Sequence, residues 1–187
     1  MSIPFRAARD DERAAAFFRV IRDEGGGYDG VLFVMNASGE PLEFVYSRIE
    51  TPRTRLWRRS DLRRRAAREL AAALFSAATS RPAVVFARAD EVDPGFFVTE
   101  IETPVATCRV AAQVAPASGA ADAHGEDVEA EGPLLLWSSG PPPEGSVEQA
   151  LVERLRPAGL LTEPFERAEA GLREARGEDG SGRGAGG

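Results

Sequence analysis

The apolar residues of the chain recur with two periods, which separate predicted strands from predicted helices. Residues 30–36 and 42–49 are apolar runs on either side of a turn with the sequence Asn-Ala-Ser-Gly-Glu-Pro, and this pattern predicts a β-hairpin. Residues 14–22 fit a strand or a short helix, and their alternation favours a strand. Short apolar runs predict further strands at residues 83–87, 96–98, 104–114 and 134–137.

The helical period is clearest after residue 60. Ser60 is the expected N-cap of a helix that is predicted to run to about residue 79. Its apolar stripe consists of Leu62, Ala66, Leu70, Ala73, Leu74 and Ala77. Two C-terminal helices are predicted at residues 146–156 and 163–176. These elements predict an α+β fold, in which a mostly antiparallel sheet of about five or six strands carries one long helix on a face and two C-terminal helices.

Composition divides the chain into segments. The predicted segments are an α+β core domain over residues 1–139 that includes a flexible acidic loop over 115–132, a Pro-rich linker over 140–145, a helical pair over 146–176 and a disordered tail over 177–187. The helical pair is expected to pack on its own sheet or, behind the linker, to dock a partner. Trp137, just before the linker, is then either a core residue or the anchor of that contact.

The overall composition limits the classes of protein to which the chain can belong. It has 187 residues, of which 43% are hydrophobic, and this is enough for one hydrophobic core. No apolar run approaches the ~18 residues of a membrane span, and the first residues contain no apolar signal segment. A single cysteine, Cys108, cannot form an internal disulfide. We therefore expect a cytoplasmic protein with no membrane partner.

Two residue types that catalysis often uses are scarce. The chain has no lysine, and its 23 basic residues are all arginine, in keeping with the Ala-, Gly-, Arg- and Pro-rich composition of a protein from a GC-rich bacterium. This excludes a P-loop and a Schiff-base mechanism, because both require lysine. The only histidine, His124, lies among small and polar residues, where a rigid catalytic base is not expected. Cys108 lies in an apolar run and is expected to be an inert thiol, so we predict no catalytic residue, metal or cofactor.

Charge is distributed unevenly along the chain. Residues 1–89 carry 16 arginines and 11 acidic residues, whereas residues 90–187 carry 7 arginines and 19 acidic residues. Nine arginines fall within residues 48–68, around the start of the predicted long helix. A cation in the first turn of a helix is unfavourable by roughly 0.3–1 kcal/mol, since it is repelled by the helix dipole. These arginines are therefore expected to meet an anionic group.

The predicted binding site is this arginine-rich segment, together with a tryptophan that offers a stacking surface. It consists of Arg53, Arg55, Trp57, Arg58, Arg59, Arg63, Arg64, Arg65 and Arg68. Its partner is expected to be a protein or the backbone of a nucleic acid, unless the arginines instead neutralise acidic residues of the same chain. We therefore predict a non-enzymatic accessory or adaptor protein.

An alternative hypothesis assigns the function to acidic residues. A sheet, a helix and then a strand that ends in acids loosely resembles the RNase H-like layout. The resemblance implies a metal-dependent nuclease in which strand-end carboxylates hold two Mg²⁺ ions, and the nearest candidates are Asp29, Glu43 and Asp90. The pattern departs from that layout in two places, because Asp29 precedes its strand and because a strand is predicted where a helix should follow the fourth strand.

Overall fold

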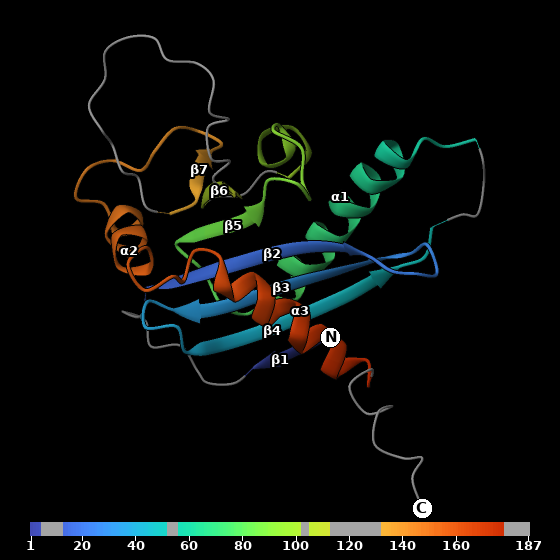
Figure 1. Ribbon diagram of the computed structural model, residues 1–187, viewed down its shortest axis with the longest axis horizontal. Coiled ribbons are helices and arrows are strands. Elements are labelled where there is room, and N and C mark those ends of the chain that lie inside the picture. Colours follow the sequence, from blue (N-terminus) through green and yellow to red (C-terminus); the bar gives the residue numbers. More distant parts are fainter. Residues whose placement is uncertain (5–12, 52–55, 102–104, 113–131, 178–187) are drawn as a thin grey trace, which may run out of the picture.

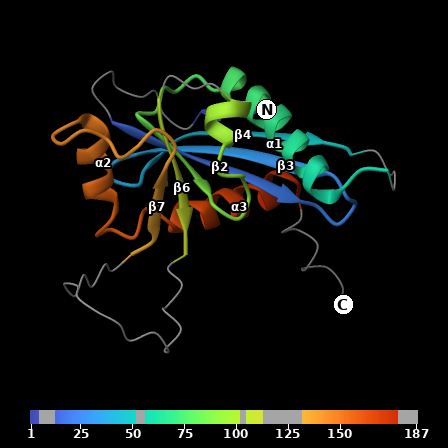
Figure 2. The ribbon, with the colours of Figure 1, turned by 90° about the horizontal axis from the view of Figure 1, so that it is seen from above.

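In the computed structural model, one β-sheet lies between two layers of helices (Figures 1 and 2). The structure describes residues 1–4, 13–51, 56–101, 105–112 and 132–177. The strands are β1 (Ser2–Pro4), β2 (Ala14–Arg22), β3 (Tyr28–Asn36), β4 (Pro41–Ile49), β5 (Val84–Arg88), β6 (Ala106–Ala111) and β7 (Leu134–Trp137). The helices are α1 (Arg59–Ala77), a single π-helical turn η1 (Phe96–Glu100), α2 (Val147–Leu155) and α3 (Glu163–Ala175).

The prediction of an α+β fold is confirmed, but the sheet is mixed and larger than expected. The seven described strands lie in the order β1-β4-β3-β2-β5-β6-β7. β5 runs parallel to both of its neighbours, β2 and β6, whereas the other adjacent pairs of described strands are antiparallel. The parallel pairing of β2 and β5 arises because α1 carries the chain from β4 back across one face of the sheet.

The predicted hairpin forms β3 and β4, and residues 14–22 form the strand β2 that was favoured for them. Asn36 closes the hairpin turn, because its side-chain oxygen accepts hydrogen bonds from the N–H groups of Ser38 (2.9 Å) and Glu40 (3.0 Å). Gly39 adopts a φ of +83°, a conformation that side chains rarely tolerate. The turn residues and the alternation of apolar and polar residues therefore specify this hairpin without long-range contacts.

The strand predicted at residues 96–98 is wrong, since these residues begin η1. Phe96 and Phe97 are adjacent in sequence and are both buried in the same hydrophobic core. Their rings lie 5.9 Å and 6.4 Å from the ring of Phe18, measured between centroids. Successive side chains of a strand point to opposite faces, so only a helical turn places both rings in one core.

Helix α1 begins and ends earlier than predicted. Its N-cap is Arg58 rather than Ser60, and Arg58 makes no capping hydrogen bond through its side chain. Its buried residues are Ala66, Ala67, Leu70, Ala71 and Leu74, so Ala73 and Ala77 of the predicted stripe are exposed. The helix packs unusually close to the sheet at Gly30, where an added Cβ would lie 2.9 Å from Cβ of Leu70.

The two C-terminal helices pack on their own sheet, on the face opposite α1 (Figure 2). Leu151 and Leu155 of α2 and Phe165 and Leu172 of α3 share one hydrophobic core with that face. Trp137 packs against the same core, with its ring 6.5 Å from the ring of Phe86. The linker therefore does not separate these helices from the sheet. The predicted acidic loop and tail lie outside the described residues, apart from their ends at residues 132 and 177.

In the described part of the chain, no helix is long and apolar enough to cross a membrane.

Glu43 of β4 determines where the chain leaves α1. Its carboxylate is 1% exposed and accepts hydrogen bonds from the main-chain N–H groups of Thr79 (3.0 Å and 3.1 Å) and Ser80 (2.8 Å). The Thr79 hydroxyl donates a further bond of 3.1 Å. A buried carboxylate that accepts several hydrogen bonds is stabilised in its place, and it fixes the loop that leads from α1 to β5.

Replacement of Glu43 with alanine is expected to lower the free energy of unfolding by about 2 kcal/mol, because two partly buried main-chain N–H groups would lose their charged acceptor. Urea denaturation followed by far-UV circular dichroism measures this change. Glu174→Ala, at an exposed position of α3, is the matched control and should change stability by less than about 0.5 kcal/mol. Equal effects of the two substitutions would contradict the role assigned to Glu43.

Candidate functional site

The start of α1 presents exposed apolar and cationic side chains together. We call this surface the Trp57 face, and it consists of Leu56, Trp57, Arg58, Arg59, Arg64, Arg65 and Arg68. Leu56 is 93% exposed and Trp57 is 45% exposed. Arg53 and Arg55, which were also predicted to belong to the site, lie outside the described residues. The structure therefore places the described members of the predicted site along the first turns of one helix.

Three of the five arginines of the Trp57 face, and the neighbouring Arg63, pair with carboxylates of the same chain. Arg63 and Arg64 both contact Asp93, each at 3.2 Å, in the loop that follows β5. Arg65 pairs with Glu69 at 2.7 Å. The guanidinium of Arg68 lies 3.9 Å from a carboxylate oxygen of Glu100. These side chains are 40–58% exposed on the arginine side, so each pair contributes about 0–1 kcal/mol and is open to exchange with other anions.

Trp57 lies beside the arginines rather than in the core. The guanidinium carbon of Arg65 lies 6.0 Å from the centre of the Trp57 ring, at the outer limit of a cation–π contact. A hollow of about 370 Å³ lies between the tryptophan, Arg64, Arg68 and Glu100. Arg58 and Arg59, at the helix start, are exposed and pair with no acid in the described part of the chain.

The acids of the nuclease hypothesis do not converge. Asp29 lies within β3 and not before it, as was predicted, because β3 begins at Tyr28. It faces α3, where it binds Arg176, and burial raises the pKa of its carboxyl while the charge of Arg176 opposes that shift. Glu43 lies on the α1 side of the sheet and binds the loop that follows α1. Asp90 lies in the turn after β5 and binds Arg88. Among the described residues, no group of three or more His, Cys, Asp and Glu side chains could hold a metal ion.

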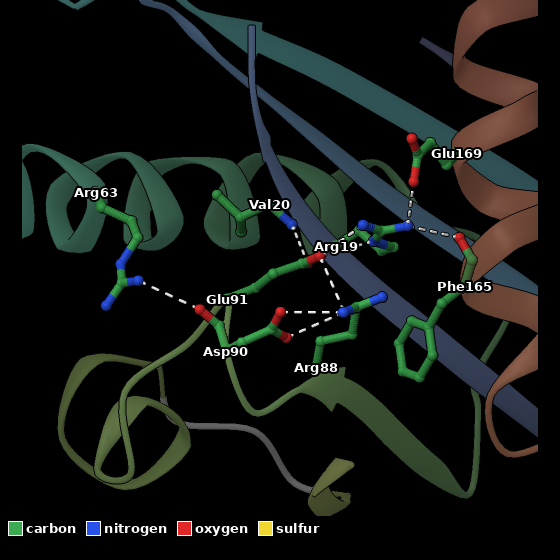
Figure 3. A network of polar contacts seen from close by, with 8 residues as sticks. All are labelled: Arg19, Val20, Arg63, Arg88, Asp90, Glu91, Phe165 and Glu169. Carbon is green, nitrogen blue, oxygen red and sulfur yellow. Dashed lines mark hydrogen bonds and ion pairs between the residues drawn. The ribbon is translucent and has the colours of Figure 1, made fainter. Parts of the chain in front are cut away.

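A different set of charged residues meets where the parallel pairing of β2 with β5 ends (Figure 3). The guanidinium of Arg19, 8% exposed, donates to the Glu91 carboxylate at 2.7 Å and 2.9 Å. It also donates to the carboxylate of Glu169 and to the carbonyl of Phe165, both at 2.8 Å. The N–H of Val20, which lies beyond the last paired residues of β2 and β5, donates to Glu91 at 2.9 Å. Arg19 therefore lies between two acids, one from the loop that follows β5 and one from α3.

Neighbouring groups extend this network towards α1 (Figure 3). Arg88 donates two hydrogen bonds of 3.0 Å to Asp90, and these lower the pKa of the Asp90 carboxyl. Arg63 donates to the main-chain carbonyl of Asp90 at 3.2 Å. Burial raises the pKa of the Glu91 carboxyl, and the hydrogen bonds from Arg19 act in the opposite direction. Each carboxylate in the network binds a guanidinium, an arrangement that leaves no vacant set of oxygen ligands for a cation.

The sequence hypotheses missed the central position of Arg19. The available signal was an arginine within the apolar run Phe17-Phe18-Arg19-Val20, since a charge in such a run is buried only when it is paired. Its partners Glu91 and Glu169 are 72 and 150 residues away in the sequence. Their identity therefore could not be read from local spacing.

Addition of about 5 mM Mg²⁺ or Mn²⁺ is expected to leave the melting temperature unchanged within about 1 °C. A ligand that binds only the native state raises its stability in proportion to the logarithm of its concentration, so a metal site with submillimolar affinity would be visible. Differential scanning calorimetry with EDTA as the reference measures the shift. An increase of several degrees in the melting temperature that depends on metal concentration would support a metal site and contradict this prediction.

The thiol of Cys108 is expected to resist alkylation in the folded protein. The side chain is fully buried, and burial raises its pKa to about 12, so the reactive thiolate is scarce at pH 8. Iodoacetamide labelling followed by intact-mass spectrometry should show no modification at pH 8 in buffer and complete modification in urea. Rapid labelling of the native protein would show that this thiol is accessible and activated.

Comparisons with known proteins do not assign a family. No model of a protein family matches the chain, and no curated protein matches it. Among solved structures, the chain is similar to the crystal structure of an endonuclease V from Bacillus subtilis, with 15% sequence identity and a TM-score of 0.32. The match covers 56% of this chain and 46% of that chain, which is less than half of its length. The functional argument therefore rests on the site itself.

Proposed function

We propose that the protein is a non-enzymatic accessory or adaptor protein that binds another protein through the Trp57 face. The exposure of Leu56 and Trp57 beside several arginines is the observation that carries this proposal. The cores of protein interfaces are enriched in aromatic residues and arginine, and tryptophan and arginine contribute most of the residues whose loss weakens binding strongly. We place this activity in the cytoplasm, because the single cysteine forms no internal disulfide.

The balance of charge favours a protein over a nucleic acid as the partner. Asp93, Glu69 and Glu100 offset four arginines at or beside the Trp57 face, and the whole chain has a formal net charge of −7. Binding to a nucleic-acid backbone depends on cationic side chains that neutralise phosphates and displace their counterions, and a net positive charge assists the approach. A surface of paired charges around an exposed tryptophan instead suits a partner with both apolar and charged side chains.

The nuclease alternative draws support from topology only. The central strand order β4-β3-β2-β5-β6, with β5 and β6 parallel to β2, is that of an RNase H-like sheet. One fold hosts many functions, so the argument depends on the acids. Asp29, Glu43 and Asp90 bind separate groups, and Arg19 fills the space between Glu91 and Glu169. We therefore do not propose nuclease activity.

Replacement of Trp57 with alanine is expected to weaken binding to the partner about 30-fold, which corresponds to the loss of about 2 kcal/mol from a central interface residue. Quantitative affinity capture from the native host identifies the partner by comparing wild-type protein with Trp57→Ala. Titration calorimetry with the purified partner then measures the change in Kd.

Val147→Ala is the matched control, because Val147 is also 45% exposed but lies on α2, away from the Trp57 face. It should leave binding unchanged within about twofold. Capture of the same proteins by wild type and Trp57→Ala would overturn the proposal. Binding to duplex DNA or RNA that weakens steeply with salt and with Arg64→Glu would instead identify a nucleic acid as the partner.

A further inference from the structure

A second cavity lies at the other end of α1 and has a different chemistry from the Trp57 face. Its volume is about 810 Å³, and it lies between the last turns of α1, the loop that leads to β5 and the residues that follow η1. Ligand-binding cavities typically measure about 300–1,000 Å³ and are mostly apolar with a few polar groups. This cavity fits both criteria.

The cavity marks the place where the α1-side core is incompletely covered. Four apolar side chains that pack against this core are only partly buried here, namely Phe75, Ala78, Ile101 and Val105. Such side chains leave apolar surface in water at a cost of roughly 25 cal/mol per Å². A bound apolar group would remove that surface from water.

The described part of the connection between β5 and β6, residues 89–101 and 105, contains no α-helix that covers this face of the sheet. Parallel neighbours in a sheet are commonly connected by a helix that covers one face. Here the described part of the connection contains η1, which has five residues. Phe96 and Phe97 of η1 cover the neighbourhood of Phe18, but the sheet beside Val85 and the end of α1 remains next to the cavity.

The residues that line the cavity include one cation that has no acidic partner in the described part of the chain. Arg81 lines the cavity and is exposed, and neither an ion pair nor a hydrogen bond links it to another described residue. Ser80, which also lines the cavity, offers a hydroxyl, while its main-chain N–H is bound by Glu43. The acid that lines the cavity, Glu100, lies 3.9 Å from Arg68. The polar residues of the cavity are therefore suited to bind one carboxylate group.

From this arrangement we propose that the cavity binds a free carboxylic acid with an apolar tail, such as a medium-chain fatty acid. The tail lies against Phe75, Ile101 and Val105, and the carboxylate binds the Arg81 guanidinium, which can donate two parallel hydrogen bonds. Arg81 is the only cationic residue among the described residues that line the cavity, and this favours a single carboxylate over a phosphate, which typically binds several cationic groups. The cavity shares only Glu100 with the described lining of the hollow beside Trp57, and neither Phe75 nor Arg81 belongs to the Trp57 face. The proposal therefore goes beyond the adaptor function, and its test is independent of that function.

Decanoate is the probe, used below its micellar concentration, and titration calorimetry is the measurement. Wild-type protein should bind it with a stoichiometry of one. Ala72→Leu fills the cavity from an exposed position of α1 and should weaken binding at least about 10-fold, as expected for the loss of more than about 1.4 kcal/mol. Ala73→Leu is the matched control, because Ala73 is the next exposed residue of the same helix and does not line the cavity.

The carboxylate contact is tested separately with Arg81→Gln and with decan-1-ol, which has the same tail and no charge. Arg81→Gln should weaken decanoate binding about 10-fold, since the carboxylate would lose its charged hydrogen-bond donor, and should leave decanol binding unchanged. The proposal is overturned if decanoate does not saturate one site, if Ala72→Leu and Ala73→Leu behave alike, or if Arg81→Gln weakens both ligands equally. Thermal denaturation confirms that each variant is folded.

Discussion

The buried guanidinium of Arg19 is the interaction on which the arrangement of the layers depends. It joins the middle strand of the sheet to the loop after β5 through Glu91 and to α3 through Glu169 and the Phe165 carbonyl. A charge buried in this way is tolerated only when its hydrogen-bonding groups are satisfied, because the loss of hydration costs several kcal/mol. The contacts to Glu169 and Phe165 therefore add to the hydrophobic packing that holds α3 on the sheet.

The ion pairs around Arg19 also limit which chemistry this end of the sheet can support. At the ends of the parallel strands, where carboxylates could have gathered around a metal, each carboxylate of the network binds a guanidinium instead. The charges at this end of the sheet are thus used to hold secondary structure elements together. Residues available for binding lie elsewhere, at the two ends of α1, where one surface combines tryptophan with paired arginines and one cavity combines apolar side chains with Arg81.

The charges of the arginine-rich segment are balanced in part by acidic residues that are distant in the sequence. The nine arginines within residues 48–68 predict a meeting with anionic groups, either on a partner or on the same chain. Arg63 and Arg64 contact Asp93, which lies about 30 residues further along the chain, and Arg68 lies near Glu100. These acids were counted in the acidic half of the sequence, and only folding brings them to the arginines. The exposed Trp57 then becomes the more informative residue of the segment.

Local patterns in the sequence determined the hairpin of β3 and β4, the helix α1 and the two C-terminal helices, because each depends on neighbours within a few residues. Tertiary structure alone decided the parallel pairing of β2 with β5, the helical turn at Phe96 and Phe97, and the partners of Arg19, Glu43 and Asp29. These contacts join residues that are tens of positions apart, and the free energy that selects them comes from burial and from satisfied charges in the assembled core. Neither quantity is encoded in the spacing of residues along one segment.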